Sequence, residues 1–352
     1  MRKTYTFDDV LLPPKWGTNI KSRNECSTTS YFSRHVQIAI PIASANMRTV
    51  TDAYMCDAMS QAGGIGILHR AFSDIEDWKL EIDRVKTAKF GISIGINTPW
   101  EKLLNYLFSP SRKTHYSPRV VVIDVAHAGN QHVYDFTKEI INWKQQLQLK
   151  ALDIVVGNIA TAEAARRYKE LEIDGLKVGV GGGAACTTRL MTGCGVAQLT
   201  AIQDVAQVLK RSDIKLIADG GITKPGDVVK ALAAGADCVM MGKELAIAKE
   251  SPGWVDHSRT TKYAPSGHQW SKIYQGEASF RNDRAPEGVQ QVISLAVNEN
   301  PKTVKEIIVD YYQDGIQSGM SYQNAKTIPQ LQENAEFWEV STNTLIENKA
   351  RN

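Results

Sequence analysis

The sequence predicts an α/β protein built as a (β/α)8 TIM barrel, and three observations support this fold class. Short apolar runs alternate with amphipathic segments along the first 250 residues, the runs number eight, and chemically distinctive residues follow their ends. Near-continuous apolar runs separated by helices indicate parallel strands that are buried on both faces. Eight repeats favour a closed barrel over an open doubly wound sheet, which is the competing interpretation of the same pattern.

The eight predicted strands are apolar runs that stop at a glycine or a polar residue. They cover residues 37–45 (QIAIPIASA), 64–69, 91–96, 119–126, 152–158, 175–180, 215–220 and 237–242. Between them lie segments such as TAEAARRYKEL at 161–171 and KPGDVVKALAA at 224–234, which have the spacing of amphipathic helices. We expect one domain with its barrel at about 37–250 and a flap and C-terminal extension at about 251–342.

After the eighth run the pattern breaks. Residues 251–288 are rich in proline, glycine, serine and charge, which predicts a long functional or disordered loop. Residues 301–317 predict a helix with Pro301 near its first turn. The tail at 343–352 is polar, so we expect it to be frayed.

Composition excludes several classes of function. A formal net charge of +3 over 352 residues, without a lysine or arginine block, argues against a nucleic-acid partner. Five cysteines without a CxxC pair argue against a disulfide framework and a structural zinc site, and they fit a reducing cytoplasm. The first residues contain no apolar signal segment, and the longest apolar runs have the length of strands, so we expect no membrane span.

The segment richest in candidate chemistry is KVGVGGGAACTTR at 177–189. Four of the five residues from Gly179 to Gly183 are glycines, which permit positive φ and a close approach of the backbone to a ligand. Such a loop can present N–H groups to an anion or carbonyls to a cation. It leads to Cys186, a candidate nucleophile if peptide dipoles or the nearby Arg189 lower the pKa of its thiol. Taken alone, the loop fits a glycine-rich connector with an inert cysteine equally well.

Two further segments point to a nucleotide. IADGGI at 217–222 places Asp219 at a strand end before two glycines, which suits a ribose diol beside a phosphate-binding turn. VMMG at 239–242 ends the next strand at Gly242. TIM barrels often bind phosphate in the loops after strands seven and eight, and these segments are the predicted seventh and eighth strands. Each segment by itself is also explained by a tight strand-to-helix turn.

Together, GVGGGAACTTR, IADGGI, TFDDVLL, SANM and GGIGILHR resemble the inosine monophosphate dehydrogenase / GMP reductase family, from Thr6 to about Ser341. The resemblance implies an oxidoreductase in which the thiolate of Cys186 adds to C2 of a purine nucleotide. The dehydrogenases oxidise IMP to XMP with NAD, and the reductases convert GMP to IMP and ammonia with NADPH. No GxGxxG follows a strand in the dinucleotide-binding pattern, so the nicotinamide would lie across the barrel mouth.

Two features and the motif SANM favour the reductase branch, and a third feature is compatible with either branch, although TFDDVLL and GGIGILHR look closer to dehydrogenases. About twenty residues separate His69-Arg70 from FGISIGI, which leaves no room for the regulatory CBS modules of most dehydrogenases. The flap QGEASFRNDRAP lacks the Arg-Tyr pair with which dehydrogenases activate water. Thr188 and Glu287 match the threonine and flap glutamate that handle the leaving ammonia in reductases, but both residues also exist in dehydrogenases. The alternatives are an IMP dehydrogenase without CBS modules and a nucleotide-binding homologue without catalysis.

The resemblance also implies the roles of individual residues. The catalytic set is Cys186, Thr188 and Glu287. The substrate-binding set is Asn46, Met47, Gly183, Asp219, Gly220, Gly221, Gly242, Lys243 and Tyr274. The cofactor-binding set is Asp124, Asn158 and Lys177. The carbonyls of Gly181, Gly183 and Cys186 match a site for a monovalent cation such as K+. Family members are usually homotetramers, and we expect Trp78, Trp100 and Trp143 to be exposed aromatics that contribute contacts.

Two departures from the family pattern concern the phosphate. GGGA stands where the family has GPGS, so Ala184 replaces a phosphate-binding serine, and Gly242-Lys243 replaces Gly-Ser. We expect a phosphate site rebuilt around the ammonium of Lys243, and hence a pocket for a deoxynucleotide or a nucleotide with more phosphates. The alternative is that Lys243 points to solvent while backbone N–H groups still bind a monophosphate.

Overall fold

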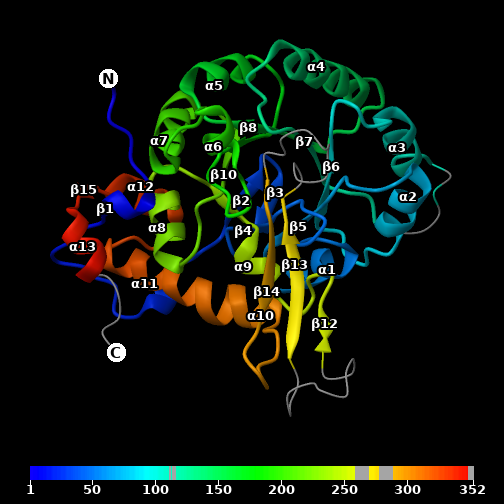
Figure 1. The fold of residues 1–352 in the computed structure, drawn as a ribbon. Coiled ribbons are helices and arrows are strands. Elements are labelled where there is room, and N and C mark those ends of the chain that lie inside the picture. Colours follow the sequence, from blue (N-terminus) through cyan, green and yellow to red (C-terminus); the bar gives the residue numbers. More distant parts are fainter. Residues whose placement is uncertain (111, 113–115, 258–268, 277–287, 348–352) are drawn as a thin grey trace.

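The computed structural model describes residues 1–110, 112, 116–257, 269–276 and 288–347. Its centre is a closed barrel of parallel strands in the order β4 to β11 (Figure 1). The barrel strands are β4 (Ile42–Ser44), β5 (Ile65–Leu68), β6 (Phe90–Ile94), β7 (Val120–Asp124), β8 (Asp153–Ile159), β9 (Gly175–Val178), β10 (Lys215–Asp219) and β11 (Cys238–Met241). The predicted TIM barrel is confirmed, and each of the eight predicted runs overlaps one of these strands.

Helices surround the barrel in an arc that Figure 1 shows from α1 to α8. They are α1 (Ala53–Gln61), α2 (Ile75–Asp83), α3 (Trp100–Leu107), α4 (Gln131–Gln146), α5 (Ala162–Lys169), α7 (Gln198–Leu209) and α8 (Pro225–Ala233). Several begin at a side chain that accepts a hydrogen bond from the first turn: Asp52, Asp74, Asn130 and Thr161. Two short helices, α6 (Thr188–Thr192) and α9 (Lys243–Ala246), follow β9 and β11.

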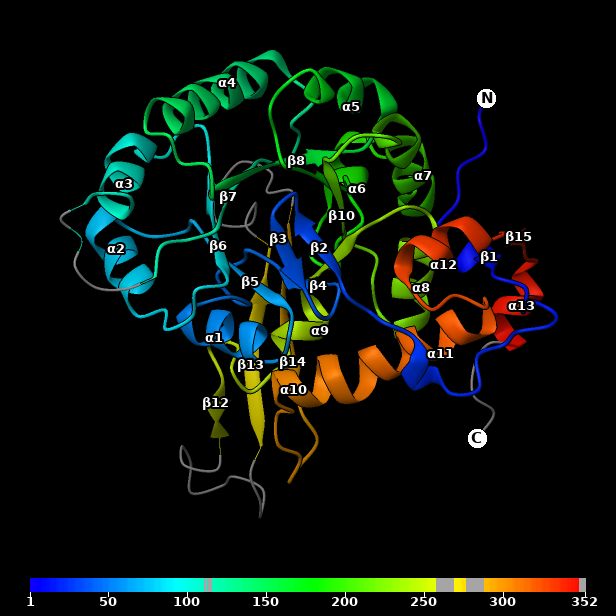
Figure 2. The same ribbon diagram turned by 180° about the vertical axis from the view of Figure 1, so that it is seen from behind.

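The N-terminal end of the barrel is closed by a hairpin of β2 (Ser30–Ser33) and β3 (Val36–Ile38), which faces the viewer in Figure 2. Phe32 and Ile38 are fully buried and pack with inward-facing side chains of the barrel strands. The prediction of one strand over 37–45 is therefore wrong, because the segment divides at Pro41 between β3 and β4. Proline has no N–H to donate, so it interrupts the ladder there.

The flap sheet consists of β12 (Val255–Asp256), β13 (Trp270–Gln275) and β14 (Gln290–Ser294), and it projects beyond the barrel in Figure 1. The prediction of an irregular loop over 251–288 is thus wrong for β12 and β13. In β13, Lys272 and Tyr274 are buried whereas Ile273 between them is exposed, so alternate side chains face the barrel. The flap sheet therefore carries Tyr274 to the barrel mouth.

The C-terminal extension begins at Thr303, whose side chain caps α10 (Val304–Ile307). Pro301 lies before the cap, and the helix continues through η5 (Ile308–Gln313) and α11 (Asp314–Tyr322), so the predicted helix at 301–317 was placed a few residues too early. Then follow α12 (Ile328–Asn334), β15 (Trp338–Glu339) and α13 (Thr342–Glu347). The tail predicted to be frayed is helical as far as residue 347.

The N-terminal segment lies against this extension, because β1 (Val10–Leu11) pairs with β15. The 3-10 turn η1 (Phe7–Asp9) precedes β1, and a second 3-10 turn, η2 (Arg23–Glu25), lies between β1 and β2. The predicted exposure of three tryptophans is wrong: Trp78 and Trp143 are buried in the core and Trp100 is half-buried against it. No helix in the described part of the chain combines the length and apolarity that a membrane crossing needs.

Candidate active site

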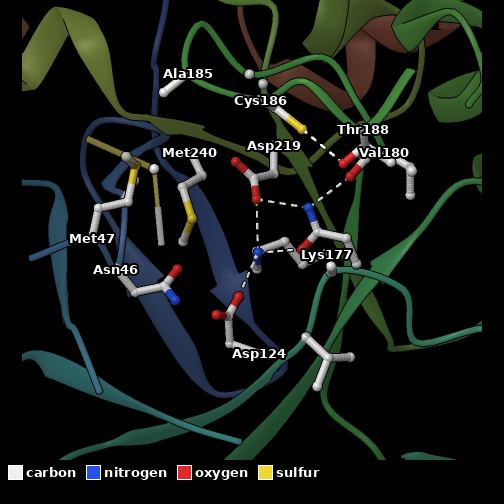
Figure 3. Close-up of a pocket in the computed structure, with 18 of the residues that line it drawn as sticks. Asn46, Met47, Asp124, Lys177, Val180, Ala185, Cys186, Thr188, Asp219 and Met240 are labelled. Atoms are coloured by element: carbon white, nitrogen blue, oxygen red, sulfur yellow. Dashed lines mark hydrogen bonds and ion pairs between the residues drawn. The ribbon is translucent and has the colours of Figure 1, made fainter. Parts of the chain in front are cut away.

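A cavity of about 550 Å³ opens at the C-terminal ends of the barrel strands, a size that suits a small-molecule ligand (Figure 3). Most of the predicted site residues line it. They are Asn46, Met47, Asp124, Asn158, Lys177, Gly181, Gly183, Cys186, Thr188, Asp219, Gly220 and Tyr274. The fold therefore brings together predicted residues from five of the eight strand ends and from the flap sheet.

Three predicted residues do not line this cavity. Gly242 lies just beyond it, since a β-carbon there would come within 2.8 Å of the Tyr274 hydroxyl oxygen. Lys243 follows on α9 with an exposed side chain, and Gly221 is exposed beside the ring of Phe7. The predicted catalytic Glu287 lies outside the described residues.

Cys186 lies between β9 and α6, with its Sγ 3.2 Å from the Thr188 hydroxyl oxygen. A tight turn forms the preceding backbone, where the Cys186 N–H donates to the Gly183 carbonyl at 3.0 Å. Gly181 has a φ of +76° and no room for a β-carbon, which would overlap the side chain of Arg189. Arg189 crosses the loop there and donates to the carbonyls of Val180 and Val196. Glycine at 181 thus lets an arginine hold the cysteine loop.

The flap sheet is attached to the same loop. Gly288, just before β14, forms an isolated antiparallel bridge with Cys186, and the Val289 N–H donates to the Ala185 carbonyl at 2.9 Å. The side chain of Gln291 donates to the carbonyl of Ala184 at 3.2 Å. Where the family motif supplies a serine hydroxyl, Ala184 therefore contributes its backbone to the flap contact.

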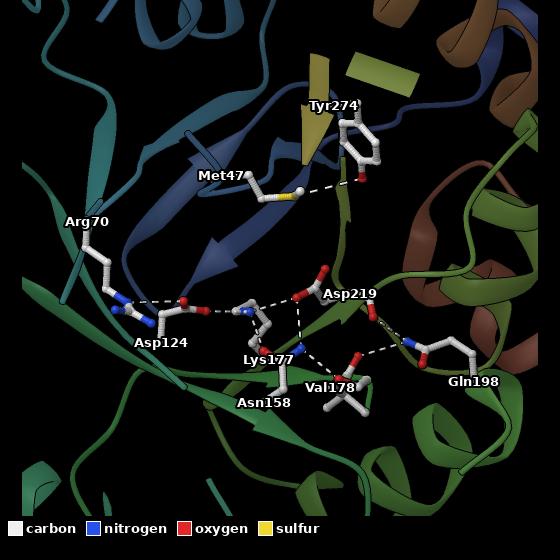
Figure 4. A network of polar contacts seen from close by, with 10 residues as sticks. Met47, Arg70, Asp124, Asn158, Lys177, Val178, Gln198, Asp219 and Tyr274 are labelled. Carbon is white, nitrogen blue, oxygen red and sulfur yellow. Dashed lines mark hydrogen bonds and ion pairs between the residues drawn. The ribbon is translucent and has the colours of Figure 1, made fainter. Parts of the chain in front are cut away.

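Lys177 forms the centre of a charged network (Figure 4), which lies below Cys186 in the view of Figure 3. Its Nζ lies 3.1 Å from Asp124 Oδ1 and 2.7 Å from Asp219 Oδ2, and Arg70 Nε lies 3.5 Å from Asp124 Oδ2. Asn158 accepts from Lys177 and donates to Asp219 at 2.9 Å. We call these five residues the floor network.

Charge balance decides the protonation of the floor network. Burial alone would raise the pKa of Asp124, but Lys177 and Arg70 outweigh it, so this pKa is lowered. Burial alone would lower the pKa of Lys177, but Asp219 and Asp124 outweigh it, so this pKa is raised. The ammonium and the Asp124 carboxylate are therefore charged at neutral pH. A carboxylate held in this way by two cations is a poor general base.

His69 and Gln198 lie next to the site without belonging to the predicted sets. Burial, with a smaller effect from Arg48, lowers the pKa of His69 to about 4, and its Nδ1 accepts from the Ala71 N–H. His69 is therefore neutral and stacks on Phe72. Gln198 opens α7 under the cysteine loop. The position of His69 at the end of a predicted strand was a sequence signal for a site residue. Nothing in a single sequence distinguishes Gln198 from other glutamines at helix ends.

The predicted cation ligands are only partly free for an ion. The Gly183 carbonyl already accepts the Cys186 N–H, whereas those of Gly181 and Cys186 accept no backbone hydrogen bond from the described residues. Elsewhere in the described chain, His35, Asp153 and Asp174 have the spacing of a metal site. That cluster lies at the N-terminal end of the barrel, where Arg34 and Lys144 pair with Asp174.

Comparisons with known proteins agree with this geometry. The family model described as "IMP dehydrogenase / GMP reductase domain" matches residues 4–351. The inosine-5'-monophosphate dehydrogenase of Borreliella burgdorferi is 31% identical over 402 aligned residues, which cover 98% of this chain and 96% of the relative. That of Cryptosporidium parvum is 30% identical with 98% and 94% coverage, and the GMP reductase of Leishmania donovani is 28% identical with 96% and 94% coverage.

Proposed function

Because the chain belongs to the IMP dehydrogenase / GMP reductase family, we propose that this oxidoreductase is a GMP reductase that uses NADPH. The observation that carries the proposal is the absence of a base suited to hydrolysis. Among the described residues that line the cavity, the carboxylates are Asp124 and Asp219, and both are held by Lys177. The flap sequence also lacks the Arg-Tyr pair with which dehydrogenases activate water.

Reductive deamination needs a nucleophile and a proton source, but no activated water. The Cys186 thiolate adds to C2 of GMP, and the 2-amino group takes up a proton and leaves as ammonia. We infer that the Thr188 hydroxyl relays that proton, with Glu287 as its expected source, and its distance of 3.2 Å from Sγ supports this role. NADPH supplies the hydride that C2 accepts as the C–S bond breaks. In sum, GMP, NADPH and two protons give IMP, NADP+ and ammonium.

The cavity has room for a nicotinamide beside the purine. Its wall continues from Asp124 to Val125 and Ala126 after β7 and to Asn97 after β6. Val125 and Ala126 offer an apolar surface for a flat ring, and Arg70 and Asn97 offer donors for ribose and phosphate oxygens. These residues fit a dinucleotide laid across the barrel mouth, with Asp124, Asn158 and Lys177 beneath its reactive end.

A second candidate is IMP oxidation to XMP with NAD. The relatives from Borreliella burgdorferi and Cryptosporidium parvum, at 31% and 30% identity, bear that name, and TFDDVLL and GGIGILHR are closer to dehydrogenase motifs. Absorbance at 340 nm separates the two directions. The proposal predicts a loss of absorbance with GMP and NADPH and no gain with IMP and NAD. A gain with IMP and NAD would establish the dehydrogenase, and no change in either mixture would favour a non-catalytic nucleotide-binding homologue.

We further propose that Lys243 supplies charge to the phosphate. Lys243 follows Gly242, whose backbone adjoins the Tyr274 hydroxyl, and its side chain is exposed, so its ammonium is a candidate point charge for a phosphate. Lys243→Ala should raise KM for GMP about tenfold with little change in kcat, because a ground-state contact is lost. The same variant assayed with dGMP, GDP and GTP tests which nucleotide form the site prefers. An unchanged KM for every nucleotide would contradict this role.

Two proposals rest on the family resemblance alone. Monovalent cation binding at Gly181, Gly183 and Cys186 would order the cysteine loop, so activity should depend on K+. Homotetramer formation should appear as about four chain masses by light scattering. Activity that does not change when K+ is replaced by a bulky organic cation would contradict the first proposal, and a monomer would contradict the second.

A further inference from the structure

Gln198 holds two strand ends of the site with one amide group. It is 3% exposed at the first turn of α7, and its Nε2 donates to the Val178 carbonyl at 2.8 Å and to the Asp219 carbonyl at 3.2 Å. These carbonyls end β9 and β10. The side chain of Gln198 thereby fixes the starting point of the cysteine loop relative to Asp219, whose carboxylate faces the cavity (Figure 4).

The other atom of the same amide has no partner. Gln198 Oε1 is buried and accepts no hydrogen bond from any described residue. Buried acceptors are nearly always satisfied, so a donor is expected to reach this oxygen in some state of the protein. The orientation of the amide is fixed by its two Nε2 contacts, because a flipped amide would place an oxygen against two carbonyls.

Donors without acceptors lie next to this oxygen. The backbone N–H groups of Gly181, Gly182 and Gly183 make no hydrogen bond within the described chain. A β-carbon on Gly182 would lie 3.5 Å from Gln198 Oε1, so the loop passes directly over the oxygen. The same β-carbon would meet nothing closer, so the loop lies in ordinary van der Waals contact with the oxygen and is not blocked from it by another group.

Gly220, which follows Asp219, is also in direct contact with the cysteine loop. A β-carbon on Gly220 would come within 3.0 Å of the Gly182 carbonyl carbon and 3.1 Å of the Gly183 nitrogen, so the two loops touch through their backbones. A nucleotide that contacts both Asp219 and the glycine N–H groups would draw the cysteine loop toward the floor of the cavity.

We propose that Gln198 is a positioning residue whose Oε1 accepts an N–H of the Gly182–Gly183 segment when a nucleotide binds, and that this bond places Cys186 against purine C2. This assignment rests on the proposed covalent chemistry at Cys186. It predicts that Gln198 matters for attack on a bound nucleotide and leaves the exposure of the thiol in the free protein unchanged.

The test compares two reagents for Cys186. Iodoacetamide reports on the thiol of the free protein, and a 2-halo purine nucleotide reports on attack at a bound purine, in which a C–S bond forms at C2 and halide leaves. Digestion after Lys177 and Arg189 puts Cys186 and the exposed Cys194 in separate peptides, so Cys194 is an internal reference for reagent strength. The rate of loss of the unmodified Cys186 peptide is followed by mass spectrometry.

Gln198→Met keeps the side-chain volume and removes both polar atoms. We expect modification by the nucleotide to slow about tenfold or more while iodoacetamide modification stays within about twofold, since only the placement of Cys186 is lost. Gln203→Met, an exposed change on the same helix, should alter neither rate. Gly182→Ala, whose methyl would lie in van der Waals contact with Oε1 without steric overlap in the free protein, should reproduce the selective loss.

The possible outcomes separate this assignment from the proposed function. Modification of Gln198→Met by the nucleotide at the wild-type rate, or parallel slowing of both reagents in both variants, would overturn the role of Gln198 alone. If the wild-type protein is never modified by the nucleotide, the covalent chemistry of the proposed function fails, and the assignment of Gln198 fails with it.

Discussion

Lys177 in the floor network and Lys272 in the flap sheet are equally buried, at 2% exposure each. Lys177 lies between two carboxylates, which raise its pKa despite burial. Among the described residues, the acceptors of Lys272 are neutral: the Thr49 carbonyl at 2.9 Å and the Ser251 hydroxyl at 2.6 Å, beside the ring of Trp254. Burial therefore lowers the pKa of Lys272 to about 7, with Asp52 opposing the shift only weakly.

The difference shows that partners, and not burial, decide whether a buried lysine keeps its charge. In the floor network the charges of Lys177 and Asp124 are therefore held at neutral pH. At Lys272, which anchors the flap sheet to the loop after β4, the ammonium is close to its titration midpoint at neutral pH. The two regions should therefore respond differently to mutation and to pH.

The largest expected effect comes from Lys177→Met. The change leaves the Asp124 and Asp219 carboxylates buried without their shared cation, which should cost about 3–5 kcal/mol of unfolding free energy. Activity should fall about 100-fold or more, since the carboxylates repel each other below the substrate. Urea unfolding measures the loss of stability and steady-state kinetics measure the loss of activity.

The matched control is Lys272→Met, whose unfolding free energy at pH 8 should lie within about 1 kcal/mol of wild type, because Ser251 still donates to the Thr49 carbonyl. Equal losses in the two variants would contradict the comparison.

A smaller loss, about 1.5–3 kcal/mol, is expected for Asp124→Asn, which removes one charge-assisted contact and leaves Lys177 paired with Asp219. Combined with Lys177→Met it should cost less than the sum of the two single changes, because the second change no longer breaks an ion pair. Urea unfolding of all four proteins gives the coupling energy. Strict additivity would mean that the two side chains do not stabilise each other.

The smallest effect is a pH dependence confined to the flap sheet. Between pH 7 and about 10 the folded Lys272 is mostly neutral while the unfolded chain still binds its proton, so stability rises with pH across this window. The unfolding free energy of wild type minus that of Lys272→Met should rise by roughly 2 kcal/mol between pH 7 and pH 9, at 1.36 kcal/mol per proton and pH unit. Urea unfolding at both pH values measures this difference. A constant difference, or one that shrinks as pH rises, would show that Lys272 keeps its charge in the folded protein.

The sequence predicted the barrel well because its signal is local. Each strand is an apolar run with its own boundaries, and helices such as α5 begin at capping residues that can be read directly. The errors arose where contacts between residues distant in the sequence determine a strand boundary or the burial of a side chain. Pro41 separates a strand of the barrel from a strand of the closing hairpin, and Trp78 and Trp143 are covered by the core rather than exposed.

Most of the residues predicted for the site line the cavity, but the contacts between them could not be predicted from the sequence. The motif GVGGGAACTTR pointed to Cys186, yet nothing near Lys177 in the sequence shows that it pairs with Asp219, 42 residues away. Lys272 likewise meets Thr49 across 223 residues. The role of Gln198 depends on two carbonyls and a glycine loop from other elements. Such contacts appear only when the barrel closes and brings the strand ends together.

The most direct test of the central claim is the ratio of ammonia released to NADPH consumed when the protein is given GMP, with Cys186→Ala as the control. We predict one ammonia for each NADPH in the wild-type protein and neither change in the Cys186→Ala variant. NADPH consumption without ammonia, or full activity without the thiol, would contradict covalent reductive deamination at Cys186.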